Sequence, residues 1–213
     1  MNKNMIGGKA FGLEQIKLAG CYTPNWVVID VSHFQEFVKQ LPEGVLNKLY
    51  SCKSWDDEIE RVIELIQKKL KNLVVPEKTL NFVKKHFKNI KHQHGVAIRS
   101  SMISEDDKKH SYAGIFKSVL FVRSYNKCTE AVKDVWISSF SKQAIKYALL
   151  NKINLKEIKM GVIIQEMINP DYSGVLFSRD PTTGEKRQII NSVRGCSEKF
   201  VSGKVSGETI VIE

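Results

Sequence analysis

The chain has few cysteines and no long apolar stretch, and both features exclude classes of protein. Its four cysteines, Cys21, Cys52, Cys128 and Cys196, are widely spaced and form no Cys-x-x-Cys pair, so neither a zinc site nor a disulfide framework is predicted. No run approaches the roughly 18 to 20 apolar residues that cross a bilayer. Together with the absence of a signal-like N-terminus, these features predict a cytoplasmic protein that does not bind a membrane.

Histidine is also scarce, with five residues in the chain. His92 and His94 precede a predicted strand without a third ligand nearby, so they are interpreted as part of a loop and no metal ligand is assigned. No histidine lies in a recognisable nucleophile motif, although a Ser-His-Asp or Cys-His arrangement formed only in space stays open.

What the chain has is enough apolar and basic residues for a folded protein with an anionic partner. Its 213 residues are 42% hydrophobic, which suits one large domain or two small lobes. Lys and Arg number 33 against 23 Asp and Glu, a formal net charge of +10, which favours a nucleotide, a nucleic acid or a phosphorylated substrate. The lysines are scattered along predicted helices and no nucleic-acid motif is present, so nucleic acid is the least expected partner.

The order of the predicted elements indicates an α/β (mixed α+β) fold. We expect a helix-rich lobe over residues 1–94 and a strand-rich lobe over 95–213, with mixed or antiparallel sheets and flanking helices. Ser32 and a Ser54–Asp57 capping box are the expected helix starts in the first lobe. The other predicted elements are a short helix that starts on the Gly7-Gly8-Lys9 turn and stops at Gly20, a helix over 126–150, and strands over 26–29, 95–101, 114–122, 188–193 and 208–212.

The segment Met160–Gly184 is predicted to form two strands packed together, with polar residues at their connection. Its first run is nearly continuously apolar, as in a strand covered on both faces, yet it contains Gln165 and Glu166. Backbone groups leaving such a strand are suited to the edge of a purine, with a buried core strand as the alternative. Arg179 and Asp180 at the rim are either an ion pair or a phosphate and metal contact.

Two cations are candidates for binding phosphate. Lys9 follows Gly7-Gly8 at the start of a predicted helix, where unpaired amides favour an anion, although an ordinary turn explains the same residues. Arg99 lies in an apolar strand and needs an anionic or carbonyl partner. This is either a ligand phosphate or, as an internal ion pair, Glu105 or Asp106 in the following loop.

Taken together, these segments resemble the ATP-binding domain of the phosphoenolpyruvate synthase and pyruvate phosphate dikinase family, which also includes rifampin phosphotransferase. The resemblance covers most of the chain. It is carried, in order, by GGKAFGLEQIKLAG at 7–20, VAIRSSMISEDD at 96–107, SYAG at 111–114, MGVIIQEMI with SGVLFSRDPTTG at 160–184, and GCSEKFVSGKV at 195–205.

The resemblance implies an ATP-grasp-like fold whose two lobes clamp ATP and pass a phosphoryl group to a histidine on a separate domain or chain. By position in the motifs, it implies ATP binding by Lys9 and Arg99 at the phosphates, by Gly114 and Ser118 in a lid segment, and along an adenine-side strand by Gln165, Glu166 and Ile168. Mg²⁺ is expected from the family.

The chain departs from the family pattern in several places. It has Ala10 and Gly12 where the family has a glycine and an asparagine after the first lysine, and Ile115 and Phe116 where polar residues follow the lid glycine. The acidic and glutamine-containing segment that holds Mg²⁺ and the phosphocarrier histidine motif have no counterpart in the 213 residues.

We therefore expect a partial ATP-binding domain, one part of an ATP-dependent phosphotransferase that is incomplete alone. The choice of phosphoryl acceptor would lie in other domains. The alternative is a catalytically silent nucleotide-binding or regulatory module that acts through a partner.

Overall fold

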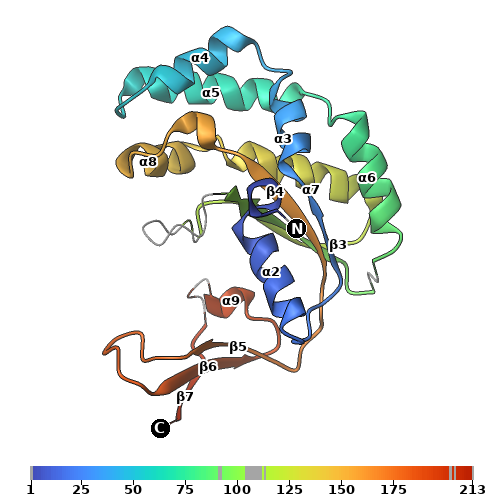
Figure 1. The fold of residues 1–213 in the computed structure, drawn as a ribbon, viewed down its shortest axis with the longest axis vertical. Helices are drawn as coiled ribbons and strands as arrows, with labels where there is room; N and C mark the ends of the chain where they lie inside the picture. Colours follow the sequence, from blue (N-terminus) through green and yellow to red (C-terminus); the bar gives the residue numbers. More distant parts are fainter. Residues whose placement is uncertain are drawn as a thin grey trace. The chain divides into compact units, whose positions relative to one another are not determined.

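The computed structural model of the chain describes residues 2–90, 93–103, 112, 114–201, 203 and 205–212, and the side chains of all these except Lys199 and Val201. Most helices precede strand β4 (Met160–Glu166), and most of the elements after it are strands (Figure 1). Their bounds are α1 Lys3–Ile6, α2 Gly8–Leu18, β1 Trp26–Ile29, α3 Val31–Val38, α4 Glu43–Ser51, α5 Asp57–Asn72, α6 Glu77–Phe87, β2 Val96–Met102, β3 Ser118–Val122, α7 Tyr125–Ser138, α8 Lys142–Leu150, a short 3-10 helix Leu155–Glu157, β4 Met160–Glu166, β5 Tyr172–Phe177, β6 Gln188–Arg194, α9 Glu198–Val201 and β7 Glu208–Ile212. The mixed α/β fold predicted from the sequence is confirmed.

The chain divides into two compact units, unit 1 over Met1–Met167 and unit 2 over Ile168–Glu213. This boundary lies far from the division at residues 94 and 95 expected from the sequence. The difference arises because β4, late in the chain, is an inner strand of the same sheet as β1, β2 and β3. Strand pairing therefore joins the helix-rich first half to the residues that follow it.

The sheet of unit 1 has the order β1-β4-β2-β3, and each neighbouring pair is antiparallel. The predicted antiparallel pairing of the strands now defined as β2 and β3 is confirmed. Every residue of β4 except Glu166 is buried, as its continuous apolar sequence predicted for a strand covered on both faces. The loop between β2 and β3, with Glu105, Asp106 and Ser111, lies mostly outside the described residues, as does His92.

Helices cover both faces of this sheet. On one face, Ile163 packs with Ile6 and Ala10 from α1 and α2. On the other face, Ile98 and Ile164 belong to the main core. That core also takes buried residues from α3, α5, α6, α7 and α8. The two-sided cover keeps the inner strands dry, which strengthens the hydrogen bonds between them.

Strands β4 and β5 do not form the packed pair that the sequence suggested for Met160–Gly184. β4 pairs with β1 and β2, whereas β5 pairs only with β6 in the sheet of unit 2. The turn formers between them connect two sheets. Alternation of side chains within one strand indicates which residues share a face, but it does not indicate which strand lies alongside.

Three helix boundaries also differ from expectation. Helix α3 is capped by Asp30, whose side chain accepts a hydrogen bond from the backbone N of Ser32, and α5 is capped by Asp56. The predicted helix over 126–150 is two helices, and Ser141 caps the second of them. In each case an Asp or Ser side chain accepts a hydrogen bond from a free backbone donor of the first turn.

Unit 2 is a three-stranded antiparallel sheet of order β5-β6-β7 with helix α9. Its strands over 188–194 and 208–212 agree with the predicted ones. Among its described apolar side chains only Ile189 is buried, and every residue of β7 is exposed. Hydrogen bonds between strands and polar turns therefore define this unit more than an apolar core does.

In the part of the chain that the structure describes, no helix combines the length and apolar character required of a membrane span.

Candidate functional site

Helix α2 begins against strand β2 at a point of very close packing. Gly7 precedes it with φ of +79°, and a Cβ at this position would lie 2.1 Å from the carbonyl oxygen of Ser101. A hydrogen bond from the backbone N of Ala10 to Ser101 Oγ, at 3.0 Å, joins the first turn of α2 to the strand. Gly7 is therefore required for packing, whether or not a phosphate binds at the helix N-terminus.

Lys9 is exposed on the same first turn, and its Nζ lies 3.4 Å from Ser100 Oγ of β2. The amino group of Lys9 thus contacts the residue that follows Arg99 in β2. Arg99 is the one exposed residue of β2, whose other six residues are buried. The expected partners Glu105 and Asp106 lie outside the described residues, so the internal ion pair stays untested.

The strand register places three of the predicted residues on one face of the sheet. Arg99 pairs with Ser118 of β3 and with Ile163 of β4, and Gln165 follows two residues after Ile163. Residues in register, and those two apart on one strand, share a face. Arg99, Ser118 and Gln165 therefore point to the face of Ile163, against which Ala10 of α2 packs.

Gln165 is the buried polar residue of this group, with 8% of its surface exposed. A buried amide requires hydrogen-bonding partners, since leaving its polar atoms unpaired costs free energy. Gln165, Arg99 and Ser118 are thus three polar residues on the face of the sheet that also carries the apolar Ile163.

Glu166 has a different environment from Gln165. Its carboxylate oxygen Oε2 accepts a hydrogen bond from Asn25 Nδ2 at 2.8 Å, and its backbone N donates to the carbonyl oxygen of Asn25 at 2.8 Å. The backbone N of Met167 donates to the carbonyl oxygen of Gly95 at 3.0 Å. The donors at the end of β4 are thus used in holding the sheet together, which leaves fewer of them for a purine edge than the sequence suggested.

The segment around Gly114 is held firmly on both sides. Tyr112 is buried, and its ring centroid lies 5.2 Å from that of Phe116 and 4.8 Å from that of Tyr147 in α8. Gly114 itself is exposed with φ of +74°. The apolar residues that replace the family's polar ones after this glycine therefore pack against the core.

On the other side of Gly114, Lys117 anchors the chain to α7. Its backbone N donates to Ser138 Oγ at 3.1 Å, and its Nζ bonds Asp134 Oδ2 at 2.5 Å. The segment leads directly into Ser118, which is exposed at the start of β3. Ile168, the last predicted site residue, is 47% exposed and is the first residue of unit 2.

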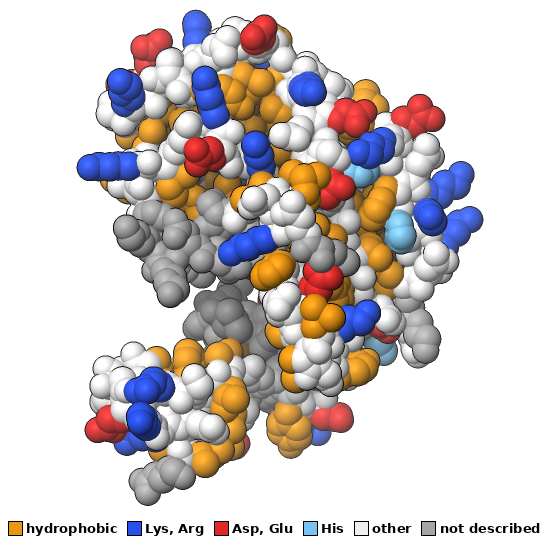
Figure 2. All heavy atoms as spheres, viewed as in Figure 1, with side chains coloured by type: hydrophobic (Ala, Val, Ile, Leu, Met, Phe, Trp, Pro, Cys, Tyr) orange, Lys and Arg blue, Asp and Glu red, His pale blue; other side chains and the backbone are white. Residues whose placement is uncertain are grey.

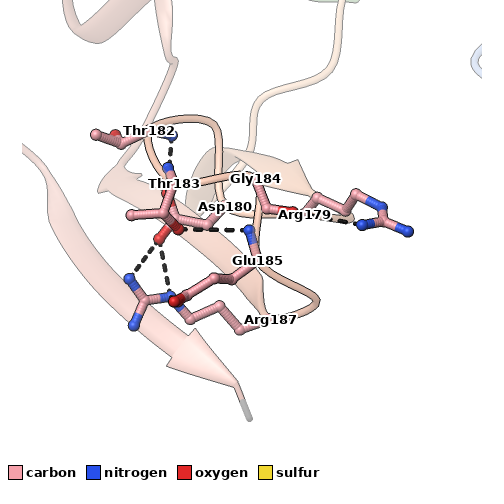
Figure 3. A network of polar contacts seen from close by, with 7 residues as sticks. All are labelled: Arg179, Asp180, Thr182, Thr183, Gly184, Glu185 and Arg187. Carbon is pink, nitrogen blue, oxygen red and sulfur yellow. Dashed lines mark hydrogen bonds and ion pairs between the residues drawn. The ribbon is translucent and has the colours of Figure 1, made fainter.

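The interpretation of Arg179 and Asp180 as an ion pair with each other is corrected by the structure of the turn after β5 (Figure 3). Asp180 pairs with Arg187, whose Nε and Nη2 lie 2.8 and 2.5 Å from Oδ2. Its Oδ1 accepts hydrogen bonds from the backbone N atoms of Thr182 and Thr183. Arg179 is exposed and donates to the carbonyl oxygen of Gly184 at 3.3 Å.

These hydrogen bonds, the one from the Thr182 backbone first, lower the pKa of Asp180 from its usual 3.8 to about 2. Since both carboxylate oxygens are occupied within the turn, Asp180 has a structural role.

The described residues form no ready-made cluster of metal ligands. They contain no group of three or more His, Cys, Asp or Glu side chains placed to hold one, whereas Mg²⁺ requires oxygen ligands such as carboxylates. We therefore assign no metal ligand among the described residues.

Sequence reasoning missed Ser101 and Asn25, which hold α2 and the end of β4 in place. Ser101 belongs to the Arg99-Ser100-Ser101 run, so the sequence alone shows a polar residue in an apolar strand at this position. Its partner, 91 residues earlier, could be identified only from the packing of α2 on β2.

Basic side chains do not gather into one broad patch on the face of unit 1 drawn in Figure 2. Lysines and arginines stand singly among acidic and apolar residues there. Some of them are paired, such as Lys142 with Glu60 and Glu64. On this face the distribution is the one expected of solvated helix faces.

Comparison with known proteins identifies relatives over nearly the full chain. The family model described as pyruvate phosphate dikinase, AMP/ATP-binding domain, matches residues 3–213. A probable phosphoenolpyruvate synthase from Archaeoglobus fulgidus is 29% identical, with 98% of this chain and 29% of that protein aligned. Rifampicin phosphotransferase from Bacillus subtilis is 26% identical over 99% of this chain and 25% of its own length. Phosphoenolpyruvate synthase from Aeropyrum pernix is 29% identical over 98% and 27%.

This chain thus spans less than a third of the length of each of these relatives. The family match itself extends across both compact units. On this evidence the chain belongs to the pyruvate phosphate dikinase AMP/ATP-binding domain family, and it is an ATP-binding domain with a mixed α/β, ATP-grasp-like fold.

Proposed function

We propose that this domain binds ATP for a phosphotransferase, and that a phosphoryl group passes from the nucleotide to a histidine on a separate domain or chain. The family match carries the proposal. Its relatives are named as phosphoenolpyruvate synthases and rifampicin phosphotransferases, which supports phosphoryl transfer as the reaction class. ATP and the four free thiols both suit a reducing cytoplasm.

In this proposal Lys9 and Arg99 bind the phosphates, and Gly114 and Ser118 lie over them. Support comes from unit 1, where Arg99 and Ser118 are paired in register and Lys9 contacts the next residue of β2. Two cations, one on α2 and one on β2, would compensate phosphate charge, and an arginine fork suits paired oxygens. Gln165, Glu166 and Ile168 are proposed to lie on the adenine side. Any Mg²⁺ would arrive with the nucleotide or be held by residues outside those described.

ATP binding by calorimetry tests the phosphate assignment. Lys9→Ala and Arg99→Ala should each raise the Kd for ATP by about tenfold or more, because each removes a charge-assisted hydrogen bond. Lys68→Ala and Arg61→Ala are matched controls, since both side chains are exposed on α5 away from β2. Unchanged affinity in both test variants would contradict the assignment of these two residues.

A second experiment separates phosphoryl transfer from silent binding. The chain is incubated with ATP labelled on its β and γ phosphates and with a separately expressed histidine domain of the family. Acid-labile label on that domain, lost in the Arg99→Ala variant, is the expected result. ATP binding without any transfer would instead favour the catalytically silent nucleotide-binding or regulatory module.

A further inference from the structure

Strand β1 is an outer strand of the unit 1 sheet, and half of its backbone faces away from the sheet. The backbone N of Glu166 donates to the carbonyl oxygen of Asn25, so residues 25 and 166 are a hydrogen-bonded pair. In an antiparallel ladder such pairs recur every second residue, which makes 27 with 164 and 29 with 162 the next ones. Trp26 and Val28 therefore direct their N–H and C=O groups outward.

These outward groups have no hydrogen-bond partner among the residues that the structure describes. Proteins usually protect such an edge, because it is a template for another strand. β1 is short, with four residues, yet it lies in a groove formed by side chains of α2 and α6. The groove has two hollows that share Lys17, Trp26, Val27 and His86.

The larger hollow, of about 750 Å³, is mainly apolar. Its apolar lining comes from the sheet face of β1 and from helices on either side. These residues are Ile6, Leu18, Trp26, Val27, Val28 and Phe82. Leu18 is 74% exposed, so part of this apolar surface is open to water. Glu14 and Asp30 also line it, and Asp30 already caps α3.

The smaller hollow, of about 280 Å³, is polar and has one cation, Lys17, in its lining. Lys17, Asn25, His86 and Asn89 line it, and no carboxylate does. Lys17 forms no ion pair with any other described residue. This hollow therefore complements an acidic side chain.

We propose that the β1 edge binds an extended peptide segment of a partner polypeptide. The segment adds a strand beside Trp26 and Val28, with an apolar side chain in the larger hollow and an Asp or Glu in the smaller one. Backbone pairing supplies affinity and the two hollows supply specificity, as in other cases of strand addition. Because α2 and α6 line both sides of β1, the groove has room for a single extended segment. The β1 strand of a second copy is recessed in the same way and fits less well.

This inference is independent of the proposed ATP reaction and needs no nucleotide. The test is selection of phage-displayed random heptapeptides on the full chain, followed by affinity measurement with the enriched peptides in synthetic form. Enriched sequences should carry an Asp or Glu near a Val, Ile, Leu or Phe. Val28→Pro should weaken their binding by about tenfold, because it removes one outward donor and proline is tolerated on an edge strand. Lys17→Glu should weaken it further.

Peptides that bind wild type and Val28→Pro equally would overturn the proposal, as would the absence of enriched sequences. Dimerisation through β1, seen as a concentration-dependent mass that Val28→Pro abolishes, would also contradict it. If Val28→Pro does not fold, N-methylation of alternate peptide bonds in the selected peptide replaces it. Methylation of the peptide bonds whose N–H groups face β1 should abolish binding, and methylation of the bonds between them should preserve it. Equal effects of the two methylation patterns would exclude strand pairing.

Discussion

The two compact units of this domain are stabilised in different ways. Unit 1 buries its inner strand β4 on both faces beneath helices. Unit 2 has a sheet of which every β7 residue is exposed and Ile189 is the one buried apolar side chain among those described. Since apolar burial is the dominant favourable term in folding, unit 1 has the means to fold alone. Unit 2 depends on strand pairing and on turns such as the one around Asp180.

The largest expected effect tests this contrast with one substitution in each unit. Ile98→Ala removes a fully buried side chain from β2 and should lower the free energy of unfolding by about 2–5 kcal/mol. Ile210→Ala, at a side chain that is 47% exposed in β7, should lower it by less than about 1 kcal/mol. Urea denaturation followed by circular dichroism measures both. Equal losses would show that the two units have comparable cores.

The contact between α2 and β2 gives the second prediction. Gly7→Ala places a Cβ 2.1 Å from Ser101 O at a positive φ, so we expect a loss of about 2–4 kcal/mol in the free energy of unfolding. Gly12→Ala in the same helix has nothing within 4 Å of its added Cβ and should stabilise by about 0.5–1 kcal/mol. A stable Gly7→Ala variant would contradict the close packing.

A buried histidine is expected to make the stability of unit 1 fall in acid. His33 is buried and its Nδ1 lies 2.9 Å from Thr79 Oγ1. Burial, assisted by Lys78, lowers its pKa below the usual 6.5, against the opposing effect of Asp30 and Glu36. Below that pH the unfolded chain takes up the proton more readily than the folded one, so stability should fall as the pH drops below about 6.5.

The control for this titration is His33→Gln, which keeps a hydrogen-bonding group but does not titrate. Its free energy of unfolding should depend less on pH between about 7.5 and 5 than that of wild type. The pKa of His86 is also lowered, by burial and by Lys85. His86→Gln therefore measures the contribution of the second histidine, and a variant His33→Gln with an unchanged pH profile would contradict the prediction.

The smallest effect is expected in unit 2. Asp180→Asn removes the ion pair with Arg187 while keeping an acceptor for Thr182 and Thr183. Amide hydrogen exchange over residues 180–187 should become faster, with little change in unit 1. Because the pKa of Asp180 is lowered to about 2, the stabilisation is present above about pH 4 and is lost as the pH falls toward 2. Unchanged exchange would mean that the strands alone order the turn.

Much of the fold could be predicted because local patterns are strong in this chain. The continuous apolar run of β4 and the helix that follows Gly7 were both recognised from the residues, and the structure has them. Helix starts were predicted less well, since Asp30 and Asp56 compete with Ser32 and Ser54 for the same role. Neighbouring cap residues have similar energies, and packing selects among them.

For the candidate site, the sequence predicted the types of residue involved but not their partners in space. Lys9, Arg99 and Gln165 were singled out as polar or charged side chains in unusual surroundings. That Arg99 pairs with Ser118, and that Asp180 pairs with Arg187 rather than with Arg179, follows from strand register and turn geometry. These depend on residues distant along the chain or on the path of a loop.

The sequence alone therefore determined the mixed α/β class, the strand character of β4 and the cations expected to bind phosphate, because propensity and side-chain chemistry are local properties. Only the tertiary structure decided that β4 and β5 belong to different sheets. It also decided that Gly7 packs on Ser101 and that β1 leaves an open edge. Those features arise from which strands pair and how closely backbones approach, and such contacts join segments that are far apart in the chain.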